Sequence, residues 1–290
     1  MSDNQPTIQA LGAEIRRRLT PLYGPGEAKA MTSLIFLALK GWGATQLAIN
    51  YDLPAQPSFI AQVDAVLSRL EKQEPIQYVL GTALFHGLEL KVTPAVLIPR
   101  PETAVLVDII ADNAGDRPDL RVLDLGTGSG CIAIALARIL KFPEITAVDI
   151  SPDALEVARG NARALKANIS FLQADMRTLS LPDSSFDIVV SNPPYIVESE
   201  KRDMESNVLD HEPALALFVP DSDPLEFYKP IGLLAIKALA PGGYLYLEIN
   251  PMFASRLSDF LKATGFSDIR VVLDSFGKKR FITCRRPDED

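Results

Sequence analysis

Apolar residues recur at helical spacing in the first eighty residues. The pattern at 8–22 predicts an amphipathic helix that ends at the Gly24-Pro25-Gly26 break. The same spacing predicts a second helix at about 31–39 and a third at about 58–70. Residues 1–80 are therefore expected to form a small helical domain.

The pattern changes in the next segment, residues 81–98. Positions 85–92 alternate apolar and polar side chains toward their end, which is typical of a strand with one buried face. We expect this segment to be a β-hairpin linker between the helical domain and the rest of the chain.

From residue 99 to residue 290, short apolar runs alternate with helical patterns. Seven runs have strand character: 121–125, 145–148, 169–172, 186–190, 244–249, 269–273 and 280–284. Four segments have helical character: 131–140, 152–165, 225–239 and 254–263. Repeated strand–helix units predict a Rossmann-like α/β domain with a mainly parallel seven-stranded sheet and helices on both faces. The last two strands, joined by a short turn, predict an antiparallel edge.

Composition narrows the class of protein. The 290 residues carry a net charge of −8, and residues 1–80 hold seven of the 29 basic and seven of the 37 acidic side chains, so the whole excess falls on residues 81–290. Such a surface repels phosphate backbones, and we expect no nucleic-acid partner. The longest apolar runs are too short for a bilayer, and the first residues lack the basic start and apolar core of a signal peptide, so we expect neither a membrane span nor a secreted protein. Cys131 and Cys284 make no disulfide framework, and neither cysteine nor histidine shows metal-ligand spacing, so we expect a cytoplasmic protein without a metal.

A glycine-rich turn lies where the first strand ends and the next helix begins. Residues 126–130 read Gly126-Thr127-Gly128-Ser129-Gly130, and glycines let the backbone pass close to a ligand. The spacing is G-x-G-x-G, and Cys131 stands where a dinucleotide fingerprint would need its third glycine. Asp124 is expected to steady this loop or to face the amino group of a cofactor. A tight turn without a ligand is the alternative interpretation.

Two further acidic residues follow strands of the same sheet. Asp149 ends the second strand, where a carboxylate can accept both hydroxyls of a ribose. Asp175 follows the third strand and is expected to approach an adenine amino group, unless it is simply a hydrated loop residue. Asp153 suits the N-terminus of the next helix and is interpreted as structural.

The segment Asn192-Pro193-Pro194-Tyr195 comes directly after the fourth strand. Pro193 and Pro194 have fixed φ and no N–H, so they present rigid carbonyl acceptors, and Asn192 adds a side-chain carbonyl. Two acceptors can hold a planar NH₂ group and aim its lone pair at a methyl donor bound at the glycine loop. Tyr195 can stack on the planar group and exclude water. We therefore expect Asn192, Pro193 and Tyr195 to be catalytic and Asn192 to Tyr195 to contact the substrate.

At this point the sequence resembles the class I methyltransferases, and more narrowly the release factor glutamine methyltransferase family. The resemblance covers nearly the whole chain. It is carried by the glycine loop, the Asn-Pro-Pro-Tyr segment, the helical N-terminal domain and three further segments: Pro75-Ile76-Gln77-Tyr78, Leu97-Ile98-Pro99-Arg100-Pro101-Glu102-Thr103 and Glu212-Pro213-Ala214-Leu215-Ala216-Leu217. The Asn-Pro-Pro-Tyr motif is shared with nucleic-acid methyltransferases and identifies the chemistry. The Ile-Pro-Arg-Pro-Glu-Thr segment is more specific.

The resemblance implies a function and its participants. The cofactor is expected to be S-adenosylmethionine, and the substrate the glutamine of a Gly-Gly-Gln motif in peptide-chain release factors. The resemblance implies cofactor contacts at Gly126, Thr127, Gly128, Ser129, Gly130, Asp149 and Asn192, and we also expect contacts from Asp175 and Met176. We expect a monomer in which residues 1–80 recognise the substrate.

Three departures from the family pattern stand near the expected cofactor site. Met176 replaces a common aromatic, Ala174 replaces a common glycine, and Asn250 follows a strand that usually continues differently. Two other functions are weighed: N-methylation of a DNA or RNA base, and a noncatalytic cofactor-binding partner protein. The acidic charge opposes the first, and the intact Asn-Pro-Pro-Tyr segment opposes the second.

Overall fold

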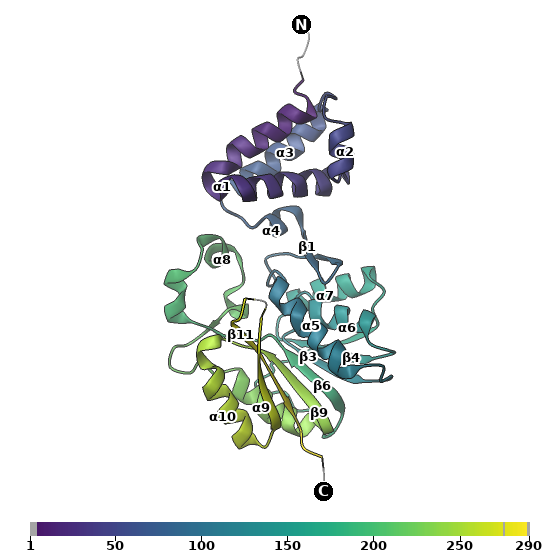
Figure 1. The fold of residues 1–290 in the computed structure, drawn as a ribbon, viewed down its shortest axis with the longest axis vertical. Coiled ribbons are helices and arrows are strands. Elements are labelled where there is room, and N and C mark those ends of the chain that lie inside the picture. Colours follow the sequence, from purple (N-terminus) through teal and green to yellow (C-terminus); the bar gives the residue numbers. More distant parts are fainter. Residues whose placement is uncertain (1–4, 275, 289–290) are drawn as a thin grey trace. The chain divides into compact units, whose positions relative to one another are not determined.

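The structure is a computed structural model that describes residues 5–274 and 276–288. The chain divides into two compact units (Figure 1): residues 1–81 with 205–211, and residues 82–204 with 212–290. Within the described ranges, no helix combines the length and the apolar character that a bilayer crossing requires.

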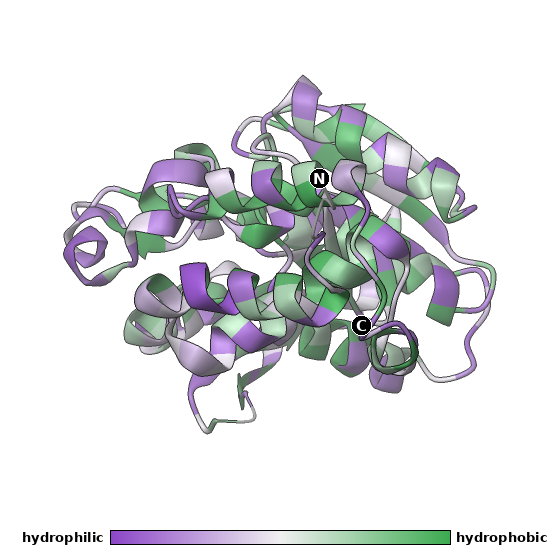
Figure 2. Ribbon diagram, turned by 90° about the horizontal axis from the view of Figure 1, so that it is seen from above, coloured by the Kyte–Doolittle hydropathy of each residue, from purple (hydrophilic) through white to green (hydrophobic). Residues whose placement is uncertain are grey.

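The first unit is helical. Its helices are α1 (Ile8–Lys40), α2 (Ala44–Ile49), α3 (Pro57–Leu70), α4 (Ile76–Leu80) and α8 (Ser206–His211). Helix α1 spans the first two predicted helices, and it is interrupted at Gly24, whose φ of 77° and ψ of 163° are not helical. The apolar faces of α1 and α3 form one core, so the predicted helical domain is confirmed. Several helices in Figure 2 alternate between green and purple, as amphipathic helices do.

Residues 205–211 belong to this unit although the sequence analysis assigned them to the α/β domain. The hydroxyl of Ser206 donates a hydrogen bond to Oε1 of Gln73 at 2.8 Å. Packing between segments so far apart in the chain leaves no periodic signal, so the pattern of residues 205–211 alone could not reveal it.

The second unit is built on a seven-stranded sheet. Its strands are β3 (Arg121–Leu125), β4 (Glu144–Asp149), β5 (Ile169–Gln173), β6 (Phe186–Ser191), β9 (Leu239–Glu248), β10 (Ser267–Leu273) and β11 (Lys279–Arg285). Their order is β10-β11-β9-β6-β3-β4-β5. Strand β11 is antiparallel to both of its neighbours, and the other pairs are parallel. The predicted mainly parallel sheet with an antiparallel edge is confirmed.

Helices cover both faces of this sheet (Figure 1). They are α5 (Pro101–Ala114), α6 (Cys131–Ile139), α7 (Pro152–Ala164), α9 (Tyr228–Ala238) and α10 (Ala254–Thr264). Successive residues of β3 alternate between two cores: Val122 packs in the core that includes α5 and α6, and Leu123 in the core that includes α9 and α10. This alternation is the period-2 pattern of a sheet buried on both faces. Helix α5 was not predicted as an element.

Short elements complete the second unit. They are β1 (Thr82–Phe85) and β2 (Leu88–Lys91), which pair as a hairpin, β7 (Ile196–Val197) and β8 (Phe218–Val219), which pair in parallel, and 3₁₀ turns at 198–203, 214–216 and 251–253. The hairpin lies inside the segment 81–98, where a β-hairpin linker was expected, and it belongs to the second unit.

The boundary between α9 and β9 was predicted wrongly. The expected helix 225–239 ends at Ala238, and Leu239 already pairs with Phe186 of β6. The register then shifts, and a Cβ at Gly243 would lie 2.9 Å from the carbonyl oxygen of Ala240 and 3.0 Å from that of Asp187. Only glycine permits this close approach of backbones, which lets β9 begin before the Pro-Gly-Gly turn.

Candidate active site

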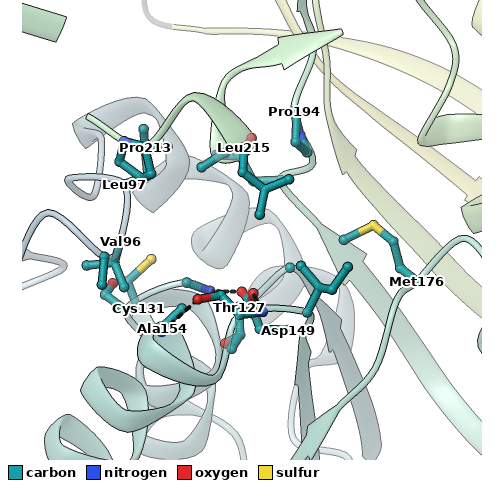
Figure 3. A pocket seen from close by; sticks show the side chains of 18 of the residues that line it. Val96, Leu97, Thr127, Cys131, Asp149, Ala154, Met176, Pro194, Pro213 and Leu215 are labelled. Atoms are coloured by element: carbon teal, nitrogen blue, oxygen red, sulfur yellow. Dashed lines mark hydrogen bonds between the residues drawn. The ribbon is translucent and has the colours of Figure 1, made fainter. Parts of the chain in front are cut away.

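A cavity of about 280 Å³ lies in the second unit (Figure 3). Part of its wall comes from residues at or just beyond the carboxyl ends of the parallel strands β3, β4, β5 and β6. Open α/β sheets bind ligands at this edge. Further wall residues come from the segments 95–103 and 213–216 and from Phe227.

The glycine turn after β3 forms one wall of the cavity. Gly126, Gly128 and Gly130 have φ values of 74°, 54° and 82°, a region that L side chains rarely adopt. A Cβ at Gly130 would lie 3.1 Å from Cδ1 of Ile134 and 3.3 Å from Cβ of Ala158, whereas one at Gly128 would meet no atom within 4 Å. The third glycine thus serves helix packing, and the second opens the backbone toward a ligand.

Asp149 closes this turn from the neighbouring strand. Its Oδ2 accepts a hydrogen bond from the backbone N–H of Gly128 at 2.9 Å, and its Oδ1 accepts one from Ser151 at 3.0 Å. The carboxylate lines the cavity and is held at both oxygens. Because each oxygen has a second lone pair, Asp149 can still accept hydroxyl groups from a ligand.

A second carboxylate, Asp124, lies buried beneath the turn. Thr127 donates from Oγ1 to Oδ2 of Asp124 at 2.6 Å, while Oδ1 of Asp124 has no hydrogen-bond partner among the described residues. Burial raises the pKa of Asp124 to about 7, and the Thr127 hydroxyl opposes the rise. Asp124 is not among the residues that line the cavity, so it acts on the loop rather than on a ligand directly.

Asp175 and Met176 follow β5 and line the cavity, and Figure 3 shows the side chain of Met176. The carboxylate of Asp175 accepts from the guanidinium of Arg177 at 2.8 Å, and these hydrogen bonds lower its pKa. Arg177 also bonds to Glu226 and lies 5.5 Å from the ring of Phe227. The turn that carries Met176 is thus held against the segment before α9. The methyl group of Met176 also lies close to the glycine turn, since a Cβ at Gly126 would be 2.9 Å from it.

The Asn-Pro-Pro-Tyr segment leaves β6 at the same edge. Asn192 and Pro194 line the cavity, whereas Pro193 and Tyr195 are not among its lining residues. The hydroxyl of Tyr195 donates to Oε1 of Glu248 at 3.0 Å, and burial raises the pKa of this hydroxyl above its usual value. Of the predicted cofactor residues, only Gly130 does not line the cavity.

Several functional candidates were not predicted. Thr103 lines the cavity and receives a hydrogen bond from Nδ2 of Asn192 at 3.2 Å. Its own hydroxyl donates to Oε2 of Glu248 at 2.7 Å. No local motif joins Thr103 to Glu248, so only the fold reveals the pair.

An ion pair supports the wall made by residues 95–100 and 213–216. A guanidinium nitrogen of Arg100 lies 2.7 Å from Oε1 of Glu212, whose side chain is almost fully buried. The backbone N–H of Ile98 donates to Oε2 of the same carboxylate at 3.3 Å. Both segments had been singled out in the sequence, but without an expected contact between them.

The chain matches known sequence families over both units. A family described as "Methyltransferase domain" matches residues 116–259, and a family described as "PrmC N-terminal domain" matches residues 11–81. The first range contains the glycine turn, Asp149 and Asn192. The second covers most of the helical unit.

Curated relatives match over nearly the whole length. A release factor glutamine methyltransferase of Bacteroides thetaiotaomicron is 45% identical over 281 residues, which cover 96% of this chain and 100% of the relative. A release factor glutamine methyltransferase of Flavobacterium psychrophilum is 38% identical over 91% of this chain and 94% of the relative. Among solved structures, a methyltransferase from Pyrococcus furiosus has a TM-score of 0.50 at 18% identity over 70% of this chain and 90% of that chain, a likeness of fold.

Proposed function

The chain belongs to the release factor glutamine methyltransferase family, and on that premise we propose how its residues perform the reaction. The enzyme transfers a methyl group from S-adenosylmethionine to the side-chain amide nitrogen of a glutamine in peptide-chain release factors. The target is the glutamine of a Gly-Gly-Gln motif. One observation carries the assignment of the site: Asp149 and Asn192 line the same cavity.

The residues of the cavity fit S-adenosylmethionine. Asp149 offers acceptors for a ribose diol, and the open turn at Gly128 lets the backbone approach the amino acid moiety of the cofactor. Met176 and Leu215 supply apolar walls for a flat base, and Asp175 stands beside Met176 as an acceptor for its amino group. When bound, the cofactor supplies an electrophilic methyl group on a positively charged sulfur.

Asn192 holds the group that receives the methyl. An amide nitrogen is a poor nucleophile because its lone pair is delocalised into the carbonyl. Oδ1 of Asn192 and the carbonyl oxygen of Pro193 can each accept one hydrogen of the target NH₂, which turns the lone pair toward the methyl donor. The nitrogen becomes acidic as it is methylated and gives its proton to solvent water after the transfer, so no strong base is needed in the methyl-transfer step. The catalytic effect is positioning and electrostatic stabilisation.

Pro194 and Tyr195 complete this arrangement. Pro194 lines the cavity and keeps the segment rigid beside the target, while the ring of Tyr195 packs behind it in the core of α9 and α10.

The helical unit selects the release factor, and the α/β unit performs the chemistry. A single glutamine offers too little surface to specify one protein, so a second contact area must provide recognition. The helical unit exposes three large hydrophobic side chains in the short stretch 49–53, namely Ile49, Tyr51 and Leu53. The residues of the cavity, by contrast, all belong to the other unit. We further propose that the enzyme acts as a monomer in the cytoplasm, where translation takes place.

Mass spectrometry of a release factor after incubation with enzyme and S-adenosylmethionine tests the site. The wild type should add one methyl group to the Gly-Gly-Gln glutamine, and Asn192→Ala should leave that glutamine unmodified over the same interval. Methylation by the variant at the wild-type rate would refute the role of Asn192. Methylation of a nucleic acid in place of the protein would support the alternative substrate.

A further inference from the structure

A chain of hydrogen bonds runs behind Asn192 into the protein interior. Nδ2 of Asn192 donates to Oγ1 of Thr103 at 3.2 Å, and that hydroxyl donates to Oε2 of Glu248 at 2.7 Å. The other oxygen of Glu248 accepts from the Tyr195 hydroxyl at 3.0 Å. Thr103 and Glu248 are 2% and 1% exposed, so water does not replace these partners.

The donors and acceptors in this series of hydrogen bonds can be arranged in one direction only. An amide NH₂ group donates and cannot accept, so the Thr103 oxygen must accept from Asn192 and turn its own hydrogen to Glu248. If the Asn192 amide were rotated by half a turn, Oδ1 would face the Thr103 oxygen. The single hydroxyl hydrogen could then satisfy Asn192 or Glu248, but not both, and a buried acceptor without a donor is costly.

Glu248 is the buried acceptor at the end of this series of hydrogen bonds. Burial raises the pKa of its carboxyl, whereas the hydroxyls of Thr103 and Tyr195 and the positive charge of Arg280 favour its charged form. The two oxygens of Glu248 each face a hydroxyl, and in its charged form the carboxylate accepts hydrogen bonds only, so it then fixes the direction in which both hydroxyls point. The carboxylate of Glu102 is the like charge that opposes this state.

We propose that Thr103 and Glu248 are positioning residues that set the orientation of the Asn192 side chain. They hold its Nδ2 inward and so leave Oδ1 as the acceptor for the NH₂ group of the target glutamine. The inference rests on the proposed role of Asn192 and adds the reason why its amide presents oxygen rather than nitrogen. Without Thr103, the amide samples both orientations, and one of them offers the target a donor in place of an acceptor.

The test compares Thr103→Val, which keeps the shape and removes the hydroxyl, with Thr103→Ser, which keeps the hydroxyl. Turnover on intact release factor should fall by roughly 5- to 20-fold in Thr103→Val, the effect of about one hydrogen bond. It should stay within about twofold of wild type in Thr103→Ser. KM for the release factor and the affinity for S-adenosylmethionine should change less than turnover in both, because the hydroxyl acts on orientation and not on binding. Thr103→Ala is measured in parallel and replaces Thr103→Val if the valine variant does not fold.

A double-mutant cycle separates positioning from general support of the fold. If Thr103 acts through Asn192, Thr103→Val should have no further effect in an Asn192→Ala enzyme. An undiminished fall in that background, or a fall in Thr103→Ser equal to that in Thr103→Val, would overturn the inference. Wild-type turnover by Asn192→Ala alone would instead refute the proposed function of Asn192, so the two failures can be told apart.

Discussion

Replacing Asp149 by alanine should weaken cofactor binding and leave the protein folded. The carboxylate accepts backbone hydrogen bonds from Gly128 at 2.9 Å and Ser151 at 3.0 Å, and these exist with or without a ligand. Their loss should therefore appear as a decrease of about 1–3 kcal/mol in the free energy of unfolding.

The effect on affinity has a separate origin. Asp149 lines the cavity, and the second lone pair on each of its oxygens can accept the hydroxyls of a ribose. A hydrogen bond to a charged acceptor contributes about 1.5–3 kcal/mol, so one such bond corresponds to roughly a 10- to 150-fold loss of affinity for S-adenosylmethionine. Titration calorimetry measures this loss directly.

Asp153 offers a matched control. It also lines the cavity, but it lies in the first turn of α7, where a carboxylate stabilises the helix N-terminus by about 0.3–1 kcal/mol. Asp153→Ala should leave the affinity for the cofactor within about twofold of wild type. Unchanged affinity in Asp149→Ala would show that Asp149 does not contact the cofactor. An equal loss of affinity in Asp153→Ala would show that the effect comes from the loss of negative charge near the cavity and not from a hydrogen bond.

Three other outcomes are expected. Asn192→Ala should lower kcat on release factor by roughly 10²- to 10³-fold and leave most of the cofactor affinity; wild-type kcat would contradict its role. Burial raises the pKa of Asp124 from 3.8 to about 7, so its contribution to stability is lost as the pH rises through that interval. In urea unfolding, the free energy of unfolding of Asp124→Asn should therefore rise by about 2–4 kcal/mol relative to that of the wild type between about pH 4 and pH 8. A difference that does not change with pH would disprove the shift. Ile49→Glu should lower kcat/KM on intact release factor but not on a short Gly-Gly-Gln peptide, while Leu84→Glu, equally exposed at 75% but in the other unit, should change neither; equal losses on both substrates would refute substrate selection by the helical unit.

The sheet could be predicted because its physical signal is local. Short apolar runs mark β3 and β6, which are buried on both faces of the sheet, and the repetition of such runs with helical patterns between them indicates the α/β class. The error at Leu239 has a different origin, since pairing with β6 and the close approach at Gly243 override an apolar run that reads as helix. The short helices α2 and α8 are not long enough to show a period.

The site could be predicted only in part for the same reason. The glycine turn, Asp149 and Asn192 each sit at the end of a strand, where the sequence itself marks the position. The contact between Thr103 and Glu248 joins α5 to β9 and has no local signature. The sequence thus identifies the residues that can touch a ligand, whereas the fold identifies those that orient them.

Asn250 shows how a departure from a family pattern can be structural. The sequence analysis set it apart because the strand before it usually continues differently. In the structure, Nδ2 of Asn250 donates to the carbonyl oxygen of Tyr195 at 3.1 Å and to Oε2 of Glu200 at 2.8 Å, and Glu200 also accepts from the backbone of Val197 at 3.0 Å. These bonds hold the chain on the far side of the Asn-Pro-Pro-Tyr segment, while Thr103 and Glu248 hold Asn192 from behind. Both ends of the segment are therefore fixed by side chains outside the motif. We expect Asn250→Ala to lower turnover more than it lowers the affinity for S-adenosylmethionine.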